Sequence, residues 1–166
     1  DLPVTPQTVF RTGSVSKQFT AMAIALLAEE GKLELDADVH RYLPDLRGYG
    51  APVTIRQMVH HVAGMGDYDA DLFRKADGSE FRFGNEDYWS IAEFYDAVRD
   101  VPLRYAPGTR WEYSNLGYFL LSQVVERVSG MTLRQYADRH MFAPLGMSHT
   151  MFYDNVNEPV KYRADG

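Results

Sequence analysis

The segment from Ser14 to Glu30 constrains the fold of this chain more than any other, because it predicts a helix that is apolar around most of its circumference. Gly31 follows as a suitable C-terminal capping residue. A helix of this kind must be buried on several sides. Its apolar positions are Phe19, Ala21, Met22, Ala23, Ile24, Ala25, Leu26, Leu27 and Ala28.

The remaining periodicity predicts shorter helices joined by loops, with little strand. Thr54, Ser90 and Thr132 are suitable helix caps, and Gly130 is a suitable helix end. The predicted helices cover residues 54–62, 90–98, 115–128 and 132–141, with a helical turn at 39–43 and a long loop over 65–86. A length of 166 residues suits one domain. We therefore expect a single, mainly α domain with long loops over residues 1–166, although a sheet would also suit the 14–30 helix as a packing partner.

Composition excludes several classes of partner and cofactor. Acidic residues outnumber basic ones by 23 to 17, and a net charge of −6 disfavours nucleic acid. The longest apolar run, Ala21 to Ala28, is far shorter than the roughly 20 residues that span a bilayer. Without cysteine there is no disulfide and no thiolate metal site. His60 and His61 would point about 100° apart on a helix, and His40, His140 and His149 have no partner at ligand spacing. We expect neither a metal nor another cofactor.

Ser14 and Lys17 form the first candidate for chemistry. Their i, i+3 spacing places both on one face at the start of the predicted helix. The positive end of a helix dipole favours developing negative charge on such a serine. A neutral lysine one turn later can take the serine proton, and apolar burial favours the neutral form. The alternative is an ordinary N-cap serine followed by a solvated lysine.

Tyr113-Ser114-Asn115 is the second candidate, between a Pro-Gly turn and a helix start. A tyrosine there can hold or transfer a proton if a nearby ammonium lowers its pKa. The Asn115 amide offers both a donor and an acceptor to an acyl amide. The alternative is a half-buried tyrosine and an asparagine N-cap.

Taken together in their context, these motifs resemble the serine β-lactamase and penicillin-binding-protein superfamily, in particular its class C β-lactamase-like branch. That branch also holds esterases and D-amino-acid peptidases. The resembling stretches, in one consistent order, are residues 8–20, 30–36, 42–44, 53–58 with His61 and Gly64, 107–118, 126–130 and 144–147.

The resemblance implies a role for each motif residue. Ser14 matches the acyl-accepting nucleophile, and its backbone N–H would supply half of an oxyanion hole. Lys17 matches the lysine that activates the serine. Tyr113 matches a proton acceptor or relay, and Asn115 matches the residue that holds Lys17 and the substrate amide. The implied activity is that of a serine hydrolase that forms an acyl-enzyme on a β-lactam, a D-Ala peptide or a small ester.

The sequence also departs from the family pattern. No Lys-Thr-Gly, Lys-Ser-Gly or His-x-Gly motif follows Tyr113, and the strands that precede the serine helix in the family are missing. We therefore expect the helical portion of an α+β fold, truncated at both ends, inactive by itself, and prone to self-association through the exposed Ser14–Glu30 helix. Val62-Ala63 replaces the small hydroxyl residues usual after His61, which questions the hydrogen bonding at this turn.

Two alternatives remain open at this stage. The same cleft would also suit a catalytically silent domain that binds a peptide or a protein partner. The aromatic residues of the long loop fit a lid over a binding cleft as well as a small separate core; they are Phe73, Phe81, Phe83, Tyr88 and Trp89. Resemblance alone favours a periplasmic or secreted location.

Overall fold

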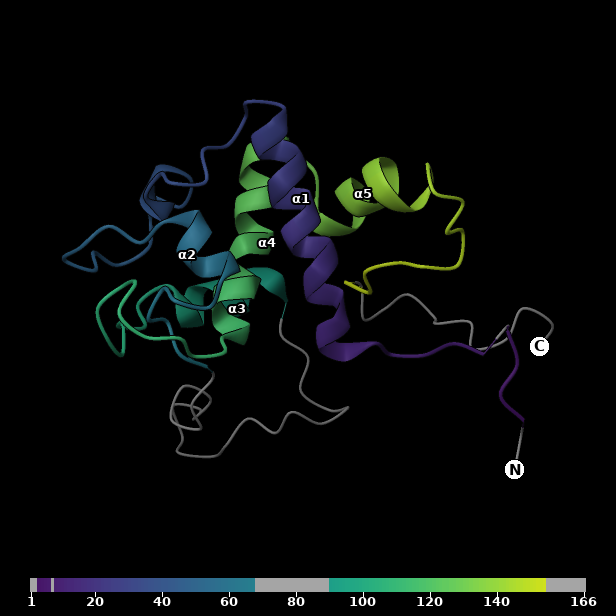
Figure 1. Cartoon of the computed structure of the whole chain (residues 1–166), viewed down its shortest axis with the longest axis horizontal. Helices are drawn as coiled ribbons and strands as arrows, with labels where there is room; N and C mark the ends of the chain where they lie inside the picture. Colours follow the sequence, from purple (N-terminus) through teal and green to yellow (C-terminus); the bar gives the residue numbers. More distant parts are fainter. Residues whose placement is uncertain (1–2, 7, 68–89, 155–166) are drawn as a thin grey trace.

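The computed structural model describes residues 3–6, 8–67 and 90–154, and these residues form helices and loops (Figure 1). The elements are η1 (Gly13–Ser16), α1 (Lys17–Glu29), η2 (Val39–Arg41), α2 (Ile55–Val59), α3 (Ile91–Val98), α4 (Asn115–Ser129), α5 (Leu133–Ala137) and the π-helical turn η4 (Asp138–Phe142). In the described ranges the only β-pairing is an isolated bridge between Asp38 and Thr54. The prediction of a mainly α structure with long loops is confirmed. The five aromatic residues of the long loop lie outside the described residues.

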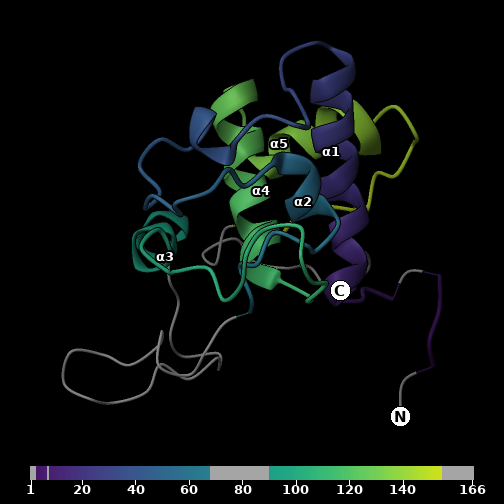
Figure 2. The ribbon, with the colours of Figure 1, turned by 60° about the vertical axis from the view of Figure 1, so that its left-hand side comes forward.

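The core is formed where α1, α4 and α5 pack on one another (Figures 1 and 2). Helix α4 also packs against α2. The two long helices supply much of the core, with the buried residues Thr20, Ala23, Ile24 and Leu27 of α1 and Leu116, Leu120, Leu121, Val124 and Val125 of α4. Together they hold the amino ends of α1 and α4 in fixed relation to each other.

The prediction that the first helix is buried on several sides is only partly correct. Helices α4 and α5, rather than a sheet, cover it within the described part of the chain. Met22 is 51% exposed and Ala25 is exposed as well. The apolar residues of α1 therefore extend beyond the area that its described neighbours cover. Self-association through this helix stays a prediction.

Local capping signals set most of the helix starts. Thr54, Ser90 and Thr132 each form a capping box, in which the cap side chain and the residue three positions later exchange hydrogen bonds. Gly130 ends α4 in the left-handed conformation, with φ 70°. The starts of these helices agree with the starts predicted from the sequence.

Two predicted helices end differently. Helix α2 stops at Val59 instead of residue 62, because His61 takes a positive φ of 60°. The predicted 132–141 helix is α-helical only to Ala137 and then widens into η4. Phe142 of this turn is buried and packs edge-on against Phe19, with ring centroids 5.0 Å apart. Such tertiary packing outweighs the local helical preference.

No helix among the described residues is long and apolar enough to cross a membrane.

Candidate active site

The Ser14 hydroxyl lies at an exposed position where two elements meet. Lys17 Nζ donates to Ser14 Oγ at 3.3 Å. The Tyr113 hydroxyl donates to the same oxygen at 2.5 Å. Lys17 is close in the sequence, whereas Tyr113 is 99 residues away. Two groups that can carry a proton therefore contact one serine oxygen.

Lys17 is held by residues at the start of α4. Its Nζ donates to Asn115 Oδ1 at 2.6 Å. The same nitrogen lies 4.7 Å from the ring centroid of Tyr113 and 5.6 Å from that of Tyr118, within the range of cation–π attraction. All four residues singled out from the sequence (Ser14, Lys17, Tyr113 and Asn115) are thus in one cluster.

The local backbone is sufficient to place Ser14 and Lys17 side by side. Gly13 has φ 53°, a conformation that favours glycine, and begins the 3₁₀ turn η1. Side chains at i and i+3 of a 3₁₀ turn eclipse each other. The sequence predicted an α-helical turn here, whereas the observed turn is 3₁₀. In this turn the Ser14 side chain points toward Lys17.

His61 positions the segment that carries Tyr113. Its backbone oxygen accepts from the Glu112 N–H at 2.9 Å, and its Nδ1 accepts from the Ser114 N–H at 3.1 Å. Its ring stacks on the Tyr113 ring with centroids 4.7 Å apart. Because Nδ1 accepts, the ring proton is on Nε2. The Tyr113 side chain is consequently fixed from both its backbone and its ring.

Main-chain hydrogen bonds continue this pairing past His61. Val62 O accepts from the Gly108 N–H at 2.7 Å, and Gly64 O accepts from the Arg104 N–H at 2.8 Å. The sequence raised doubt about this turn because Val62-Ala63 lacks hydroxyl groups. The structure shows that the turn is joined to residues 104–108 through its backbone.

The charges of the site shift two pKa values. Burial raises the pKa of Tyr113, but hydrogen bonding with Lys17 and Ser14 and the positive charge of Lys17 lower it more, so it lies below its ordinary value. Burial, together with the charge of Lys17, lowers the pKa of His61 against the opposing effect of Asp67. The first shift makes the Tyr113 hydroxyl, which donates to Ser14, easier to ionise. The second favours the neutral ring that the Ser114 hydrogen bond requires.

Replacing Gly64 by alanine is expected to destabilise the protein strongly. Gly64 has φ 81°, and an added Cβ would lie 2.2 Å from the backbone oxygen of Tyr105. The left-handed conformation alone costs an alanine about 1–2 kcal/mol, and the backbone must also move. We expect the free energy of unfolding to fall by more than about 3 kcal/mol in denaturant titrations.

Gly130→Ala is the matched control for this substitution. Gly130 has φ 70°, but an added Cβ would meet no atom within 4 Å. It should lose only the conformational part, about 1–2 kcal/mol. Equal losses for the two variants would contradict the close approach at Gly64.

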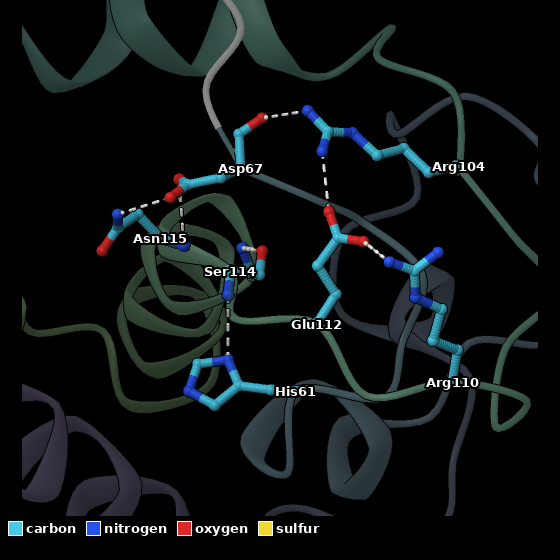
Figure 3. A network of polar contacts seen from close by, with 8 residues as sticks. His61, Asp67, Arg104, Arg110, Glu112, Ser114 and Asn115 are labelled. Carbon is cyan, nitrogen blue, oxygen red and sulfur yellow. Dashed lines mark hydrogen bonds and ion pairs between the residues drawn. The ribbon is translucent and has the colours of Figure 1, made fainter.

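A second layer of the site was not predicted from the sequence. Asp67 accepts two hydrogen bonds from Asn115, and Arg104 donates to the Asp67 backbone oxygen (Figure 3). Arg104 also pairs with Glu112 at 2.7 Å. From the sequence, Glu112 was placed only within a stretch of family resemblance. His61 was also weighed as a metal ligand and rejected, and neither residue was given a role in the site. No periodic or capping signal marks Asp67 or Arg104, because both lie in loops.

The described residues include no group of three or more histidine, aspartate or glutamate side chains that could hold a metal ion. His40, one of the histidines weighed as a ligand, instead pairs with Asp38 at 2.6 Å.

Comparisons with known proteins define the class of this fold: the similar proteins include penicillin-binding proteins and an esterase. The sequence model of the Beta-lactamase family matches residues 1–165, and the chain belongs to that family, in its class C-like branch.

Three relatives illustrate the likeness. The chain is 33% identical to Penicillin-binding protein 4* of Bacillus subtilis, with 96% of this chain and 34% of the relative covered. It is 33% identical to Esterase EstB of Burkholderia gladioli, with 97% and 46% covered. The octameric penicillin-binding protein homologue from Pyrococcus abyssi superposes with a TM-score of 0.74 at 35% identity, with 89% and 33% covered. The chain thus spans about a third to a half of the length of these relatives.

Proposed function

We propose that the protein carrying this chain is a serine hydrolase that acts through an acyl-enzyme at Ser14. One observation carries the proposal: Ser14 Oγ lies 3.3 Å from Lys17 Nζ and 2.5 Å from the Tyr113 hydroxyl. A nucleophilic serine with a base in hydrogen-bond reach, and a further group orienting that base, is the general pattern of covalent catalysis. Asn115 is the orienting group, at 2.6 Å from Lys17 Nζ.

The proposed reaction has two balanced steps. Ser14 Oγ bonds to the acyl carbon while its proton passes to Lys17 in its neutral amine form or to Tyr113 in its phenolate form, and the leaving alcohol or amine departs with that proton. Water then attacks the ester, and Ser14 regains its proton as the acid product leaves. The lowered pKa of Tyr113 makes its hydroxyl easier to ionise, which supports a part for it in the proton transfer.

The proposed substrates are a β-lactam, a D-Ala peptide or a small ester. The Asn115 amide would contact the acyl amide, and the Ser14 N–H would supply half of the oxyanion hole. The names of the two curated relatives, a penicillin-binding protein and an esterase, support acyl transfer as their shared chemistry. That the 166-residue chain by itself is inactive stays a prediction.

The test is the site of covalent modification in the whole protein. After incubation with a fluorophosphonate or a penicillin-type probe, intact mass should rise by one adduct, and peptide mapping should locate that adduct on Ser14. An adduct on another serine would contradict the proposal. No adduct with either probe would favour the alternative, a catalytically silent domain that binds a peptide or partner.

A further inference from the structure

Asp67 makes two hydrogen bonds with one residue of the candidate site. Its Oδ1 accepts from the Asn115 backbone N–H at 3.3 Å, and its Oδ2 accepts from Asn115 Nδ2 at 3.0 Å (Figure 3). The carboxylate therefore binds both the backbone and the side chain of Asn115, the first residue of α4. It contacts the site from a loop 48 residues earlier in the chain.

These contacts determine which way the Asn115 amide points. An ionised carboxylate only accepts hydrogen bonds, and an ammonium only donates them. With Nδ2 toward Asp67, Oδ1 faces Lys17 Nζ at 2.6 Å. The flipped amide would place oxygen against the carboxylate and NH₂ against the ammonium, so both contacts would become repulsive. Asp67 and Lys17 together permit a single orientation.

Asp67 is itself held in place by the neighbouring loop. Arg104 donates to the Asp67 backbone oxygen at 3.3 Å and to Glu112 at 2.7 Å, as Figure 3 shows. Gly66, with φ 65°, lets the backbone of this loop lie close to the Arg104 side chain, since an added Cβ would lie 2.3 Å from Arg104 Nε. The same guanidinium therefore joins the loop of Asp67 to the segment that leads into Tyr113.

We propose that Asp67 is a positioning residue for acyl transfer: it holds the Asn115 amide so that Oδ1 faces Lys17, and it thereby keeps Lys17 Nζ beside Ser14. A carboxylate, an amide and an ammonium in series form two charge-assisted hydrogen bonds, which are stronger than neutral ones. Asp67 acts on the reaction only through Asn115. This inference rests on the proposed function at Ser14.

The experiment measures the rate at which a fluorophosphonate probe labels Ser14 in the whole protein, with Asp67→Asn and Asp67→Ala. The probe forms a phosphonate ester with the serine oxygen and releases fluoride, so it reports on the activation of the same nucleophile. Asp67→Asn keeps the shape but can accept only with one oxygen, and its NH₂ meets the other donor. Because a displacement of about 1 Å can cost 10²-fold, we expect the labelling rate to fall by about 10–100-fold in both variants. Asp36→Asn is the matched control, since Asp36 also accepts two hydrogen bonds, both from exposed Arg56. It should stay within about twofold of the unmodified protein.

A double-mutant cycle tests whether Asp67 works through Asn115. In an Asn115→Ala background, Asp67→Ala should cause no further loss of the labelling rate. A full additional loss there would overturn the inference, as would an unchanged rate in Asp67→Asn. If Asp67→Ala unfolds, the cycle is run with Asp67→Asn; unfolding of both at the assay temperature would show a structural requirement and overturn it too. No adduct on Ser14 in the unmodified protein would overturn the proposed function and this inference together, whereas normal labelling of Asp67→Asn overturns the inference alone.

Discussion

Ser14→Ala is expected to abolish covalent labelling by acylating probes. The substitution removes the only atom of this residue that can form the acyl bond and leaves Lys17 and Tyr113 in place. Removing a serine nucleophile costs on the order of 10⁶-fold in turnover where all other groups remain. The measurement is adduct formation by intact mass in the whole protein, together with hydrolysis of a chromogenic ester. Because Ser14 is exposed, the circular dichroism spectrum and melting temperature of the variant should differ little from those of the unmodified protein.

Ser16→Ala provides the control for labelling at Ser14. Ser16 lies in the same 3₁₀ turn, and its hydroxyl donates to the Gly13 backbone oxygen at 2.7 Å. It contacts neither the lysine nor the tyrosine of the site by any hydrogen bond described. This variant should keep most of the labelling. Persistent labelling in Ser14→Ala would assign the reaction to a different serine.

Lys17→Arg is expected to lower the rate of fluorophosphonate labelling at Ser14 by about 10²–10⁴-fold, the usual contribution of a positioned general base. Arginine keeps the positive charge but does not deprotonate usefully, and its planar fork differs from the compact ammonium. That ammonium donates to Ser14 at 3.3 Å and to Asn115 at 2.6 Å. A guanidinium holds its N–H groups in one plane on a longer side chain, so it does not match the positions of both acceptors. The rate is measured by stopped-time labelling with the same fluorophosphonate probe.

Lys32→Arg makes the same chemical change away from the site. Lys32 pairs with Glu30 at 2.7 Å on the surface. Such exposed pairs contribute about 0–1 kcal/mol, so this variant should be labelled at the parental rate. Near-parental labelling in Lys17→Arg would mean that Lys17 only holds Asn115 and Tyr113 and moves no proton.

Much of the local structure followed from the sequence. The helix caps Thr54, Ser90 and Thr132 could be predicted because a cap depends on residues within one helical turn, and the structure adds that each forms a capping box. The proximity of Ser14 and Lys17 could be predicted for the same reason, since one helical turn places them together. The contacts of Tyr113 and Asn115 with Ser14 and Lys17 were indicated only by family resemblance. Nothing in the local pattern of residues 113–115 requires them to meet residues nearly a hundred positions earlier.

The sequence by itself thus determined the starts of the helices after the first, the presence of the dominant apolar helix and the Ser14–Lys17 pair, because each depends on neighbours within one helical turn. Only the tertiary structure decided the roles of His61 and Asp67. His61 had to leave the helix with φ 60° before its Nδ1 could reach the Ser114 N–H. Asp67 accepts a hydrogen bond from Asn115, which lies 48 positions later in the sequence. Hydrogen bonds between residues so far apart in the sequence depend on how α1, α2 and α4 pack. The residues of a loop carry no periodic pattern from which that packing could be predicted.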